Sequence, residues 1–171
     1  QIFLSLIDLV NCFPDVHIVY PVHPNPEVQG TAEKMLSGVD RIHLVPPLDY
    51  LTFVNLMKRS HLILTDSGGI QEEAPTLRKP LLVMRRATER PEAFQDGSAR
   101  VIGTERSAIV RESSRILQND DDVTARYNGN PYGDGKASAR IADALERWSK
   151  GLRPLLEPER EFNYEDGNRR V

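Results

Sequence analysis

Short apolar runs rich in β-branched residues alternate along the chain with longer stretches in which apolar positions recur at helical spacing. The short runs, bounded by turn formers, are typical of buried strands, whereas the longer stretches are typical of helices that cover a sheet. We expect strands at Val16 to Tyr20, Ile42 to Val45, Leu62 to Thr65, Leu81 to Met84 and Arg100 to Ile102. We expect helices at Glu27 to Leu36, Tyr50 to Arg59, Gly69 to Leu77, Arg90 to Gln95, Arg106 to Leu117 and Lys136 to Lys150. Asp49 suits the N-cap of the second of these helices, and Pro80 opens a strand, where its missing N–H is tolerated.

This alternation predicts an α/β fold with a doubly wound, mainly parallel sheet, formed by one domain over residues 1–150. The chain does not begin with Met, and its first residues place apolar side chains on one helix face at Ile2, Leu6, Leu9, Val10 and Phe13. We interpret residues 1–13 as the remnant of a preceding helix. Residues 151–171 combine two prolines with many charges and few apolar anchors, which predicts a weakly ordered tail.

Composition narrows the class of protein. The 171 residues are 39% hydrophobic and 27% charged, with no apolar run near the ~20 residues that span a bilayer, so we expect no membrane segment. The net charge of -3 argues against a nucleic-acid-binding surface. Cys12 is the only cysteine, which excludes an intramolecular disulfide and favours a reducing, cytoplasmic setting. The histidines lack partners at metal-ligand spacing, and we expect no metal or cofactor.

The segment from Thr65 to Pro75 joins the carboxyl end of an expected strand directly to a helix, which is where open α/β sheets bind ligands. Gly68 and Gly69 let the backbone approach a phosphate closely, and Ser67 adds a hydroxyl donor. A carboxylate further into the helix, at Glu73, suits the hydroxyls of a ribose. Taken alone, the segment is equally well explained as an ordinary capped helix start.

A second motif changes this balance. The run from Thr88 to Glu92 follows the next expected strand, so Arg90 should reach the same edge of the sheet. The planar guanidinium of Arg90 can hold phosphate oxygens. The two motifs together predict a site for a nucleoside diphosphate.

Four segments in this order resemble the bacterial non-hydrolysing UDP-N-acetylglucosamine 2-epimerases, over roughly Pro14 to Leu145. They are Pro47 to Leu51, Leu64 to Pro75, Thr88 to Ala93 and Asn130 to Ala137. Three neighbouring positions depart from the family pattern without removing a binding residue: Arg78, Arg86 and Ala87. The resemblance implies the second of two Rossmann-like domains in a glycosyltransferase-B-like architecture, with the active site between the domains.

The resemblance also implies residue roles. Ser67, Gly68 and Gly69 would hold the diphosphate, Glu73 would bind the ribose hydroxyls, and Arg90 would contact phosphate. Phe53 resembles the aromatic residue that stacks on uracil, although it also suits the apolar stripe of its helix, and the backbone of Leu48 resembles the partner of the uracil edge. His23 resembles part of a loop that forms an activating UDP-GlcNAc site in some members, although a structural loop role is the more common one.

By resemblance, the parent enzyme interconverts UDP-GlcNAc and UDP-ManNAc by eliminating UDP and adding it back, with acid and base groups in the first domain. We therefore expect this chain to bind UDP-GlcNAc or UDP, to be inactive without the missing N-terminal domain, and to form a possible homodimer. None of its own residues is expected to be catalytic. Two alternatives stay open: a non-catalytic UDP-sugar-binding module and a nucleotide-sugar glycosyltransferase domain.

Overall fold

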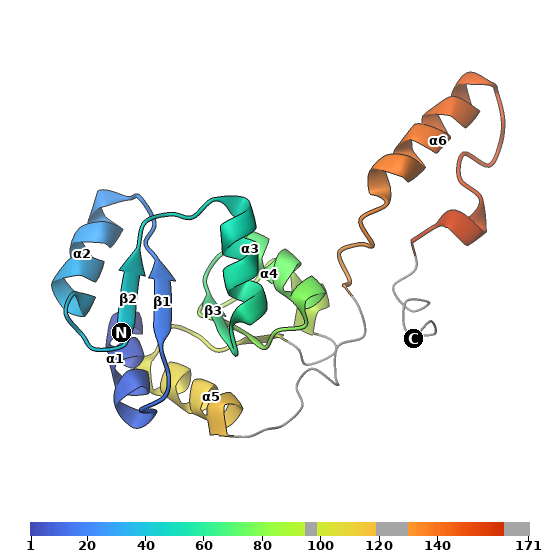
Figure 1. Ribbon diagram of the computed structural model, residues 1–171. Coiled ribbons are helices and arrows are strands. Elements are labelled where there is room, and N and C mark those ends of the chain that lie inside the picture. Colours follow the sequence, from blue (N-terminus) through green and yellow to red (C-terminus); the bar gives the residue numbers. More distant parts are fainter. Residues whose placement is uncertain (95–98, 119–129, 163–171) are drawn as a thin grey trace.

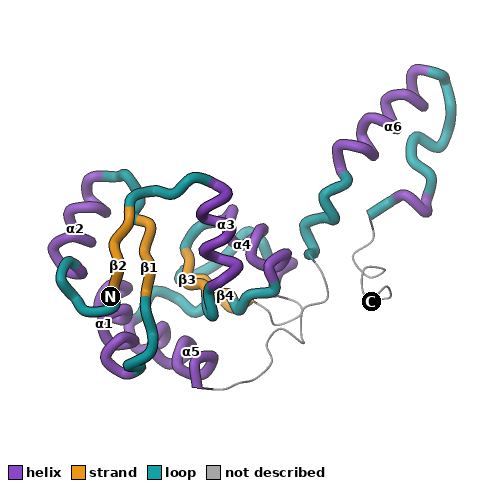
Figure 2. Tube along the Cα trace, viewed as in Figure 1, coloured by secondary structure: helices purple, strands orange, loops and turns teal. Residues whose placement is uncertain are grey.

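The strands form two parallel sheets in the computed structural model, which describes residues 1–94, 99–118 and 130–162. β1 (Ile18–Pro21) pairs with β2 (Ile42–Val45), and β4 (Leu81–Val83) lies between β3 (Ile63–Thr65) and β5 (Ala99–Val101). Every pair is parallel, with Ile18 opposite Ile42 and Ile63 opposite Leu81. Figure 2 shows helices on either side of these short strands. The parallel, Rossmann-like α/β arrangement expected from the alternating pattern is confirmed.

The helices alternate with the strands along the chain (Figure 1). They are α1 (Ile2–Cys12), α2 (Pro26–Leu36), α3 (Tyr50–Arg59), α4 (Gly68–Glu73), α5 (Arg106–Gln118) and α6 (Ala137–Ser149), with 3-10 helices η1 (Ala74–Leu77), η2 (Pro91–Phe94) and η4 (Pro158–Arg160). None of the helices in the described ranges combines the length and hydropathy needed to cross a bilayer.

Local chemistry explains several helix starts. The Asn25 side chain accepts a hydrogen bond from the Glu27 amide at 2.9 Å, and the Asp49 carboxylate accepts one from the Thr52 amide at 3.1 Å. Each carboxamide or carboxylate satisfies an amide that the first helical turn leaves unpaired. The Thr52 hydroxyl also donates to the Asp49 carboxylate, and the two hydrogen bonds from Thr52 lower the pKa of Asp49, the hydroxyl bond most. The N-cap role that the sequence favours for Asp49 is confirmed.

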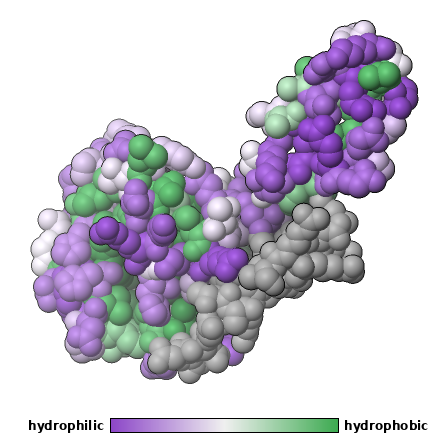
Figure 3. Space-filling view, turned by 45° about the vertical axis from the view of Figure 1, so that its right-hand side comes forward, coloured by the Kyte–Doolittle hydropathy of each residue, from purple (hydrophilic) through white to green (hydrophobic). Residues whose placement is uncertain are grey.

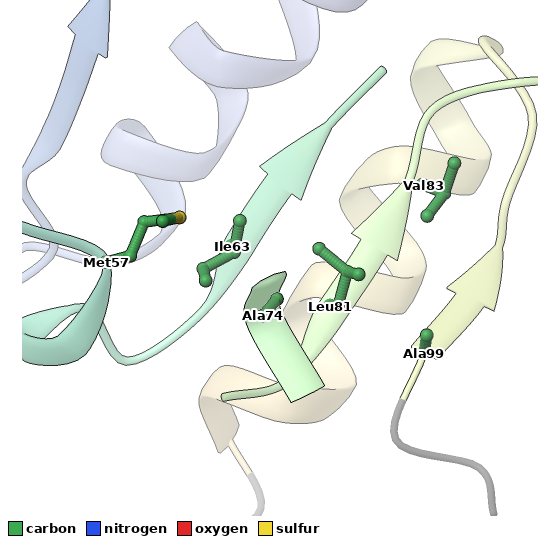
Figure 4. Close-up of a cluster of buried hydrophobic side chains, with 6 residues drawn as sticks. All are labelled: Met57, Ile63, Ala74, Leu81, Val83 and Ala99. Carbon is green, nitrogen blue, oxygen red and sulfur yellow. The ribbon is translucent and has the colours of Figure 1, made fainter. Parts of the chain in front are cut away.

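One hydrophobic core lies under the three-stranded sheet. Its fully buried members come from β3, β4, β5, α3 and η1: Met57, Ile63, Ala74, Leu81, Val83 and Ala99 (Figure 4). Phe53, Ile70 and Tyr132 pack on its periphery. This core therefore holds the helix that follows β3 firmly against the sheet.

A second core joins α1 and α2 to the two-stranded sheet through Leu6, Val10, Leu36 and Ile42. Leu64 of β3 packs against this cluster, which ties the two sheets together. α1 also packs on α5, and an ion pair between Asp8 and Arg106 spans that contact at 2.6 Å. Residues 1–13 therefore contribute a packed helix to the body of the fold.

Two expected helices have different forms in the structure. The stretch Gly69 to Leu77 is an α-helix that becomes 3-10 at Ala74, since Pro75 has no amide hydrogen to continue the α pattern. The expected helix at Arg90 to Gln95 is the short 3-10 helix η2, which begins at Pro91. Proline disfavours the α conformation in the residue before it, so Arg90 stays outside this helix. Gln95 lies outside the described residues.

The segment that carries α6 projects from the body (Figure 1), and in the view of Figure 3 its surface is mostly hydrophilic. Arg147 donates to the Pro154 carbonyl at 2.8 Å, and Arg160 pairs with Asp143 at 2.7 Å. These contacts fold residues 151–160 back along α6. Residues 163–171 lie outside the described ranges, so the weak order expected of the tail stays a prediction.

Candidate functional site

The carboxyl ends of parallel strands meet at one edge of the molecule, and the predicted site residues follow them. His23 comes after β1, Leu48 after β2, Ser67 after β3 and Arg90 after β4. Burial raises the pKa of Tyr20 at the end of β1, and the nearby Asp66 carboxylate adds to that shift. Tyr20 and Leu64 pack against the same hydrophobic cluster, so the ends of β1 and β3 are neighbours.

The turn at Ser67 leaves the start of α4 open. The Ser67 amide donates to the hydroxyl of buried Thr65 at 3.0 Å, which holds the turn against β3. Ser67 is the N-cap residue with an extended backbone, yet its side chain does not cap the helix. The exposed hydroxyl of Ser67 and the first amides of α4 can therefore bind an anion at this edge.

The Arg90 guanidinium lies directly on Gly68. A Cβ atom at position 68 would stand 2.9 Å from both Cζ and Nη1 of Arg90, closer than any ordinary contact. A side chain at position 68 would therefore force the guanidinium to move from this place. The structure thus brings Ser67, Gly68 and Arg90 together at the amino end of α4, as the two sequence motifs predicted.

Two carboxylates hold the guanidinium in this place. Arg90 Nε donates to Glu72 Oε1 at 2.5 Å, and Arg90 Nη1 donates to Glu89 Oε1 at 2.5 Å. Glu72 contributes most to raising the pKa of Arg90, so the side chain stays charged. Glu89 also accepts two hydrogen bonds from Arg85, and its pKa is lowered, first by its own backbone amide and then by Arg85. The guanidinium therefore retains a positive charge in a fixed orientation.

Residues outside the predicted set complete the surroundings of Arg90. Gln71 donates to the Ser67 carbonyl at 3.1 Å and accepts from the Thr88 hydroxyl at 2.6 Å. The Tyr132 hydroxyl donates to the Arg90 carbonyl at 3.2 Å, and Asn130 donates to Thr76 at 2.7 Å. The sequence motifs contain these residues, but hydrophobic spacing alone assigns them no role, because each acts across a long separation along the chain.

The residues expected to bind the nucleoside lie on or near α3 and α4. Glu73 is half-buried at the end of α4, and no hydrogen bond or ion pair joins its carboxylate to the described part of the chain. Phe53, on α3, is partly buried and packs against the core, which fits the apolar-stripe interpretation of this residue. Leu48 is half-buried in the loop before α3. The nucleoside roles of all three stay predictions.

His23 has a local partner. Its ring nitrogen Nδ1 accepts a hydrogen bond from the Asn25 amide at 3.1 Å, two residues along an exposed loop. This contact fits the structural loop role, and its role in an activating site stays a prediction. Within the described ranges, no group of three or more His, Cys, Asp or Glu residues is arranged to hold a metal ion.

Sequence comparisons with a family model and with individual proteins agree on one family. The family described as UDP-N-acetylglucosamine 2-epimerase matches residues 1–146. The probable UDP-N-acetylglucosamine 2-epimerase of Ralstonia nicotianae is 52% identical over 149 residues, which are 86% of this chain and 40% of that protein. The Escherichia coli UDP-N-acetylglucosamine 2-epimerase is 48% identical over 147 residues, 85% of this chain and 39% of that protein. The chain thus spans about 40% of the length of these relatives.

Solved structures agree with this result. The structure of S. aureus MnaA with UDP superposes with a TM-score of 0.82 and 41% identity, covering 90% of this chain and 41% of that one. The UDP-GlcNAc 2-epimerase from Neisseria meningitidis bound to UDP-GlcNAc gives a TM-score of 0.80 and 43% identity, covering 85% and 40%. With a family match over residues 1–146 and the same fold in these structures, the chain belongs to the UDP-N-acetylglucosamine 2-epimerase family.

Proposed function

We propose that this chain is the UDP-sugar-binding, C-terminal part of an epimerase that interconverts UDP-GlcNAc and UDP-ManNAc, and that it is inactive alone. The observation that carries the proposal is the Arg90 guanidinium lying on Gly68 at the open start of α4. Two of the solved relatives that share this fold are described as complexes with UDP or UDP-GlcNAc, which supports a nucleotide ligand here. The proposed reaction belongs to the whole enzyme.

In the proposed complex, the diphosphate lies against Ser67, Gly68 and Gly69. The amides at the start of α4 and the Ser67 hydroxyl donate to its oxygens, and the helix dipole favours its negative charge. The guanidinium of Arg90 adds a charge-assisted contact, since Nη2 is not used by Glu72 or Glu89. Neutral and charged donors thus converge on one anion.

The nucleoside would extend from the diphosphate toward α3. Glu73 would accept hydrogen bonds from the two ribose hydroxyls, for which its carboxylate has free acceptor capacity. Phe53 would stack on uracil with the part of its ring that the core leaves open, and the backbone of Leu48 would pair with the uracil edge. His23 would contribute to a separate activating UDP-GlcNAc site.

The same contacts give this part of the enzyme its share of the reaction. In the proposed elimination, the bond between the anomeric carbon and the UDP oxygen breaks, UDP keeps the electron pair, and a base removes the proton from C2. Re-addition of UDP with a proton on the opposite face inverts C2. Arg90 and the α4 amides stabilise the negative charge of departing UDP, while the proton transfers need acid and base groups from outside this chain.

Calorimetric titration of the chain with UDP and with inorganic pyrophosphate tests the binding site. We expect UDP binding, weakened by about tenfold or more in Arg90→Ala, because a charge-assisted hydrogen bond is worth about 1.5–3 kcal/mol. Arg90→Ala should weaken pyrophosphate equally. Glu73→Ala should weaken UDP alone, since pyrophosphate has no ribose.

Arg86→Ala is the matched control for Arg90→Ala, because Arg86 is exposed and lies in the same loop. It should leave UDP affinity within about twofold of the unsubstituted chain, as expected of a surface charge. Absence of UDP binding by the unsubstituted chain, or equal losses in Arg86→Ala and Arg90→Ala, would contradict the proposal.

Incubation with UDP-GlcNAc tests the second part of the proposal. We expect no UDP-ManNAc to form with this chain alone, as followed by NMR of the anomeric protons. Epimerisation by the chain would show that its own residues supply the acid and base groups. UDP binding without turnover is also expected of a stand-alone binding module. Adding the N-terminal part of a relative as a separate chain distinguishes the two candidates, because it should restore epimerisation only if this chain is part of an enzyme.

A further inference from the structure

Gln71 is a polar side chain with no solvent exposure, located one turn into α4. Burying a carboxamide is costly unless its donor and acceptor are both satisfied, so the partners of Gln71 determine why it is there. They belong to two different loops. Nε2 donates to the carbonyl of Ser67, in the turn after β3, and Oε1 accepts from the hydroxyl of Thr88, in the loop after β4.

The hydrogen bonds continue on both sides of this amide. The Ser67 amide donates to Thr65 at 3.0 Å, so the turn is anchored to the buried end of β3. The Arg90 amide donates to the Thr88 hydroxyl at 3.2 Å, so the backbone of Arg90 is anchored to Thr88. One connected network therefore runs from β3 through Gln71 to the backbone of Arg90.

The direction of each bond requires glutamine at position 71. The Ser67 carbonyl can only accept, which requires a donor on Gln71, and the single proton of Thr88 goes to Oε1. The lone pairs of Thr88 are then free to accept from the Arg90 amide. A glutamate would place a carboxylate against the Ser67 carbonyl, and an apolar residue would remove the partners of the Ser67 carbonyl and of the Thr88 hydroxyl proton.

We propose that Gln71, acting through Thr88, is a positioning residue that sets the Arg90 guanidinium against the Ser67 turn and thereby determines affinity for a nucleoside diphosphate. This inference rests on the proposed function and assigns Gln71 no direct contact with the ligand. The side chain of Arg90 has separate anchors at Glu72 and Glu89, and Tyr132 holds its carbonyl. The two hydrogen bonds of Gln71 fix the distance between the Ser67 turn and the Thr88 loop, which would bind the same diphosphate.

Two substitutions at position 88 separate the hydroxyl from the volume of the side chain. Thr88→Val keeps the shape and removes the bonds to Gln71 and Arg90, whereas Thr88→Ser keeps the hydroxyl. For the full chain titrated with UDP, we expect Thr88→Val to weaken binding about tenfold and Thr88→Ser to stay within about twofold. Gln71→Met should match Thr88→Val. Circular dichroism with thermal unfolding shows which variants are folded at the titration temperature.

A double-mutant cycle with Arg90→Ala tests whether the network acts through that residue. In the Arg90→Ala background, Thr88→Val should have little further effect on UDP affinity, because the group that it positions is absent. Losses that multiply would show that Thr88 acts independently of Arg90 and would overturn the inference. So would folded Thr88→Val that binds UDP as tightly as the unsubstituted chain.

The outcomes also separate this inference from the proposed function. If UDP binds and Arg90→Ala weakens it while the Thr88 variants do not, the positioning role alone fails. If UDP does not bind the unsubstituted chain, the nucleotide assignment fails and the positioning role fails with it. Should Gln71→Met not fold, the contrast between Thr88→Val and Thr88→Ser decides the question.

Discussion

At the scale of single residues, the two glycines of the Ser67 turn have different reasons to be glycine. A Cβ atom at Gly68 would collide with the Arg90 guanidinium, whereas the nearest neighbour of a Cβ at Gly69 is Ser67 Oγ at 4.0 Å. Neither glycine adopts a positive φ, so backbone strain does not explain them. Gly68 leaves room for the Arg90 guanidinium in its present position, whereas a side chain at Gly69 would meet no close neighbour.

Gly68→Ala should therefore displace Arg90 and weaken UDP binding by about tenfold, as measured by calorimetric titration. The free energy of unfolding should change by less than about 1 kcal/mol, because alanine favours the helix while the displaced ion pair is lost. Urea unfolding measures this second quantity.

Gly30→Ala in α2 is the matched control, since no atom lies within 4 Å of a Cβ built there. It should raise the free energy of unfolding by about 0.5–1 kcal/mol and leave UDP affinity unchanged. An unchanged UDP affinity in Gly68→Ala would show that Arg90 needs no contact with this glycine to support binding.

Residue types and motif order were sufficient to predict that Ser67, Gly68 and Arg90 lie together. The same information did not single out Gln71, because a glutamine among glutamates on a short helix looks like a solvated side chain. Its role depends on burial and on Thr88, which lies 17 positions further along the chain. Buried polar contacts of this kind have no periodic signature in a sequence.

At the level of secondary-structure elements, the helix after β3 ends at a residue with an unusual backbone conformation. Arg78 caps η1 with a left-handed backbone, φ 53° and ψ 45°. This conformation is unfavourable for a residue with a Cβ atom and is commonly occupied by glycine at helix ends. Arg78, one of the positions that depart from the family pattern, therefore occupies a strained conformation.

Arg78→Gly should raise the free energy of unfolding by about 0.5–1 kcal/mol in urea titration, since relief of strain exceeds the extra entropy of the unfolded chain. Arg41→Gly is the informative contrast. Arg41 also has a positive φ, 63°, but its guanidinium donates to the Phe13 carbonyl at 2.8 Å, which glycine cannot do. Arg41→Gly should therefore destabilise the protein, and a destabilising Arg78→Gly would count against this account.

Element boundaries were predicted to within a few residues because hydrophobic periodicity and caps are local properties. Asp49 and Pro80 begin their elements where expected, at α3 and just before β4. The helix expected at Arg90 to Gln95 was wrong in type, because the prediction gave apolar spacing more importance than the restriction that Pro91 places on Arg90.

At the scale of the whole molecule, α1 and α5 connect distant parts of the chain. Asp8 accepts hydrogen bonds from Nε and Nη2 of Arg106, 98 positions away, both at 2.6 Å. The hydrogen bond from Arg106 is the largest cause of the lowered pKa of Asp8. Since the native state favours the ionised carboxylate, this contact contributes stability that depends on pH.

Asp8→Asn should lower the urea midpoint at pH 7, and the difference from the unsubstituted chain should diminish in acid. The pKa of Asp8 is lower in the folded protein than its ordinary value of 3.8. The stability that the ion pair contributes is therefore fully present above pH 3.8 and is lost as the pH falls through the lowered pKa of the folded state. Urea titrations at several pH values between about 3 and 7 measure it.

Asp15→Asn makes the same charge change at an exposed residue. Its urea midpoint should stay close to that of the unsubstituted chain at every pH in this range. Arg106→Gln should reproduce the pH dependence of Asp8→Asn. A midpoint difference for Asp8→Asn that persists undiminished at the acidic end would show that the effect does not come from ionisation.

Three whole-molecule expectations stay predictions: the homodimer, the cytoplasmic setting and the division into residues 1–150 and a tail. Ile141, Leu145 and Trp148 form an apolar stripe on α6, with 59%, 60% and 62% of their surfaces accessible. Light scattering during size-exclusion chromatography measures whether copies associate.

Periodicity and motif order in the sequence are enough to predict the alternation of strands and helices, the parallel α/β class, and the positions of the Thr65 to Pro75 and Thr88 to Glu92 motifs at strand ends. These properties follow from local periodicity, turn chemistry and the rule that parallel strands end at one edge. Three contacts are visible only in the folded chain: the Arg90 guanidinium lies on Gly68, Gln71 joins two loops, and Asp8 pairs with Arg106. Each of these depends on distances between residues far apart in the chain, which packing of the two cores establishes and no local pattern encodes.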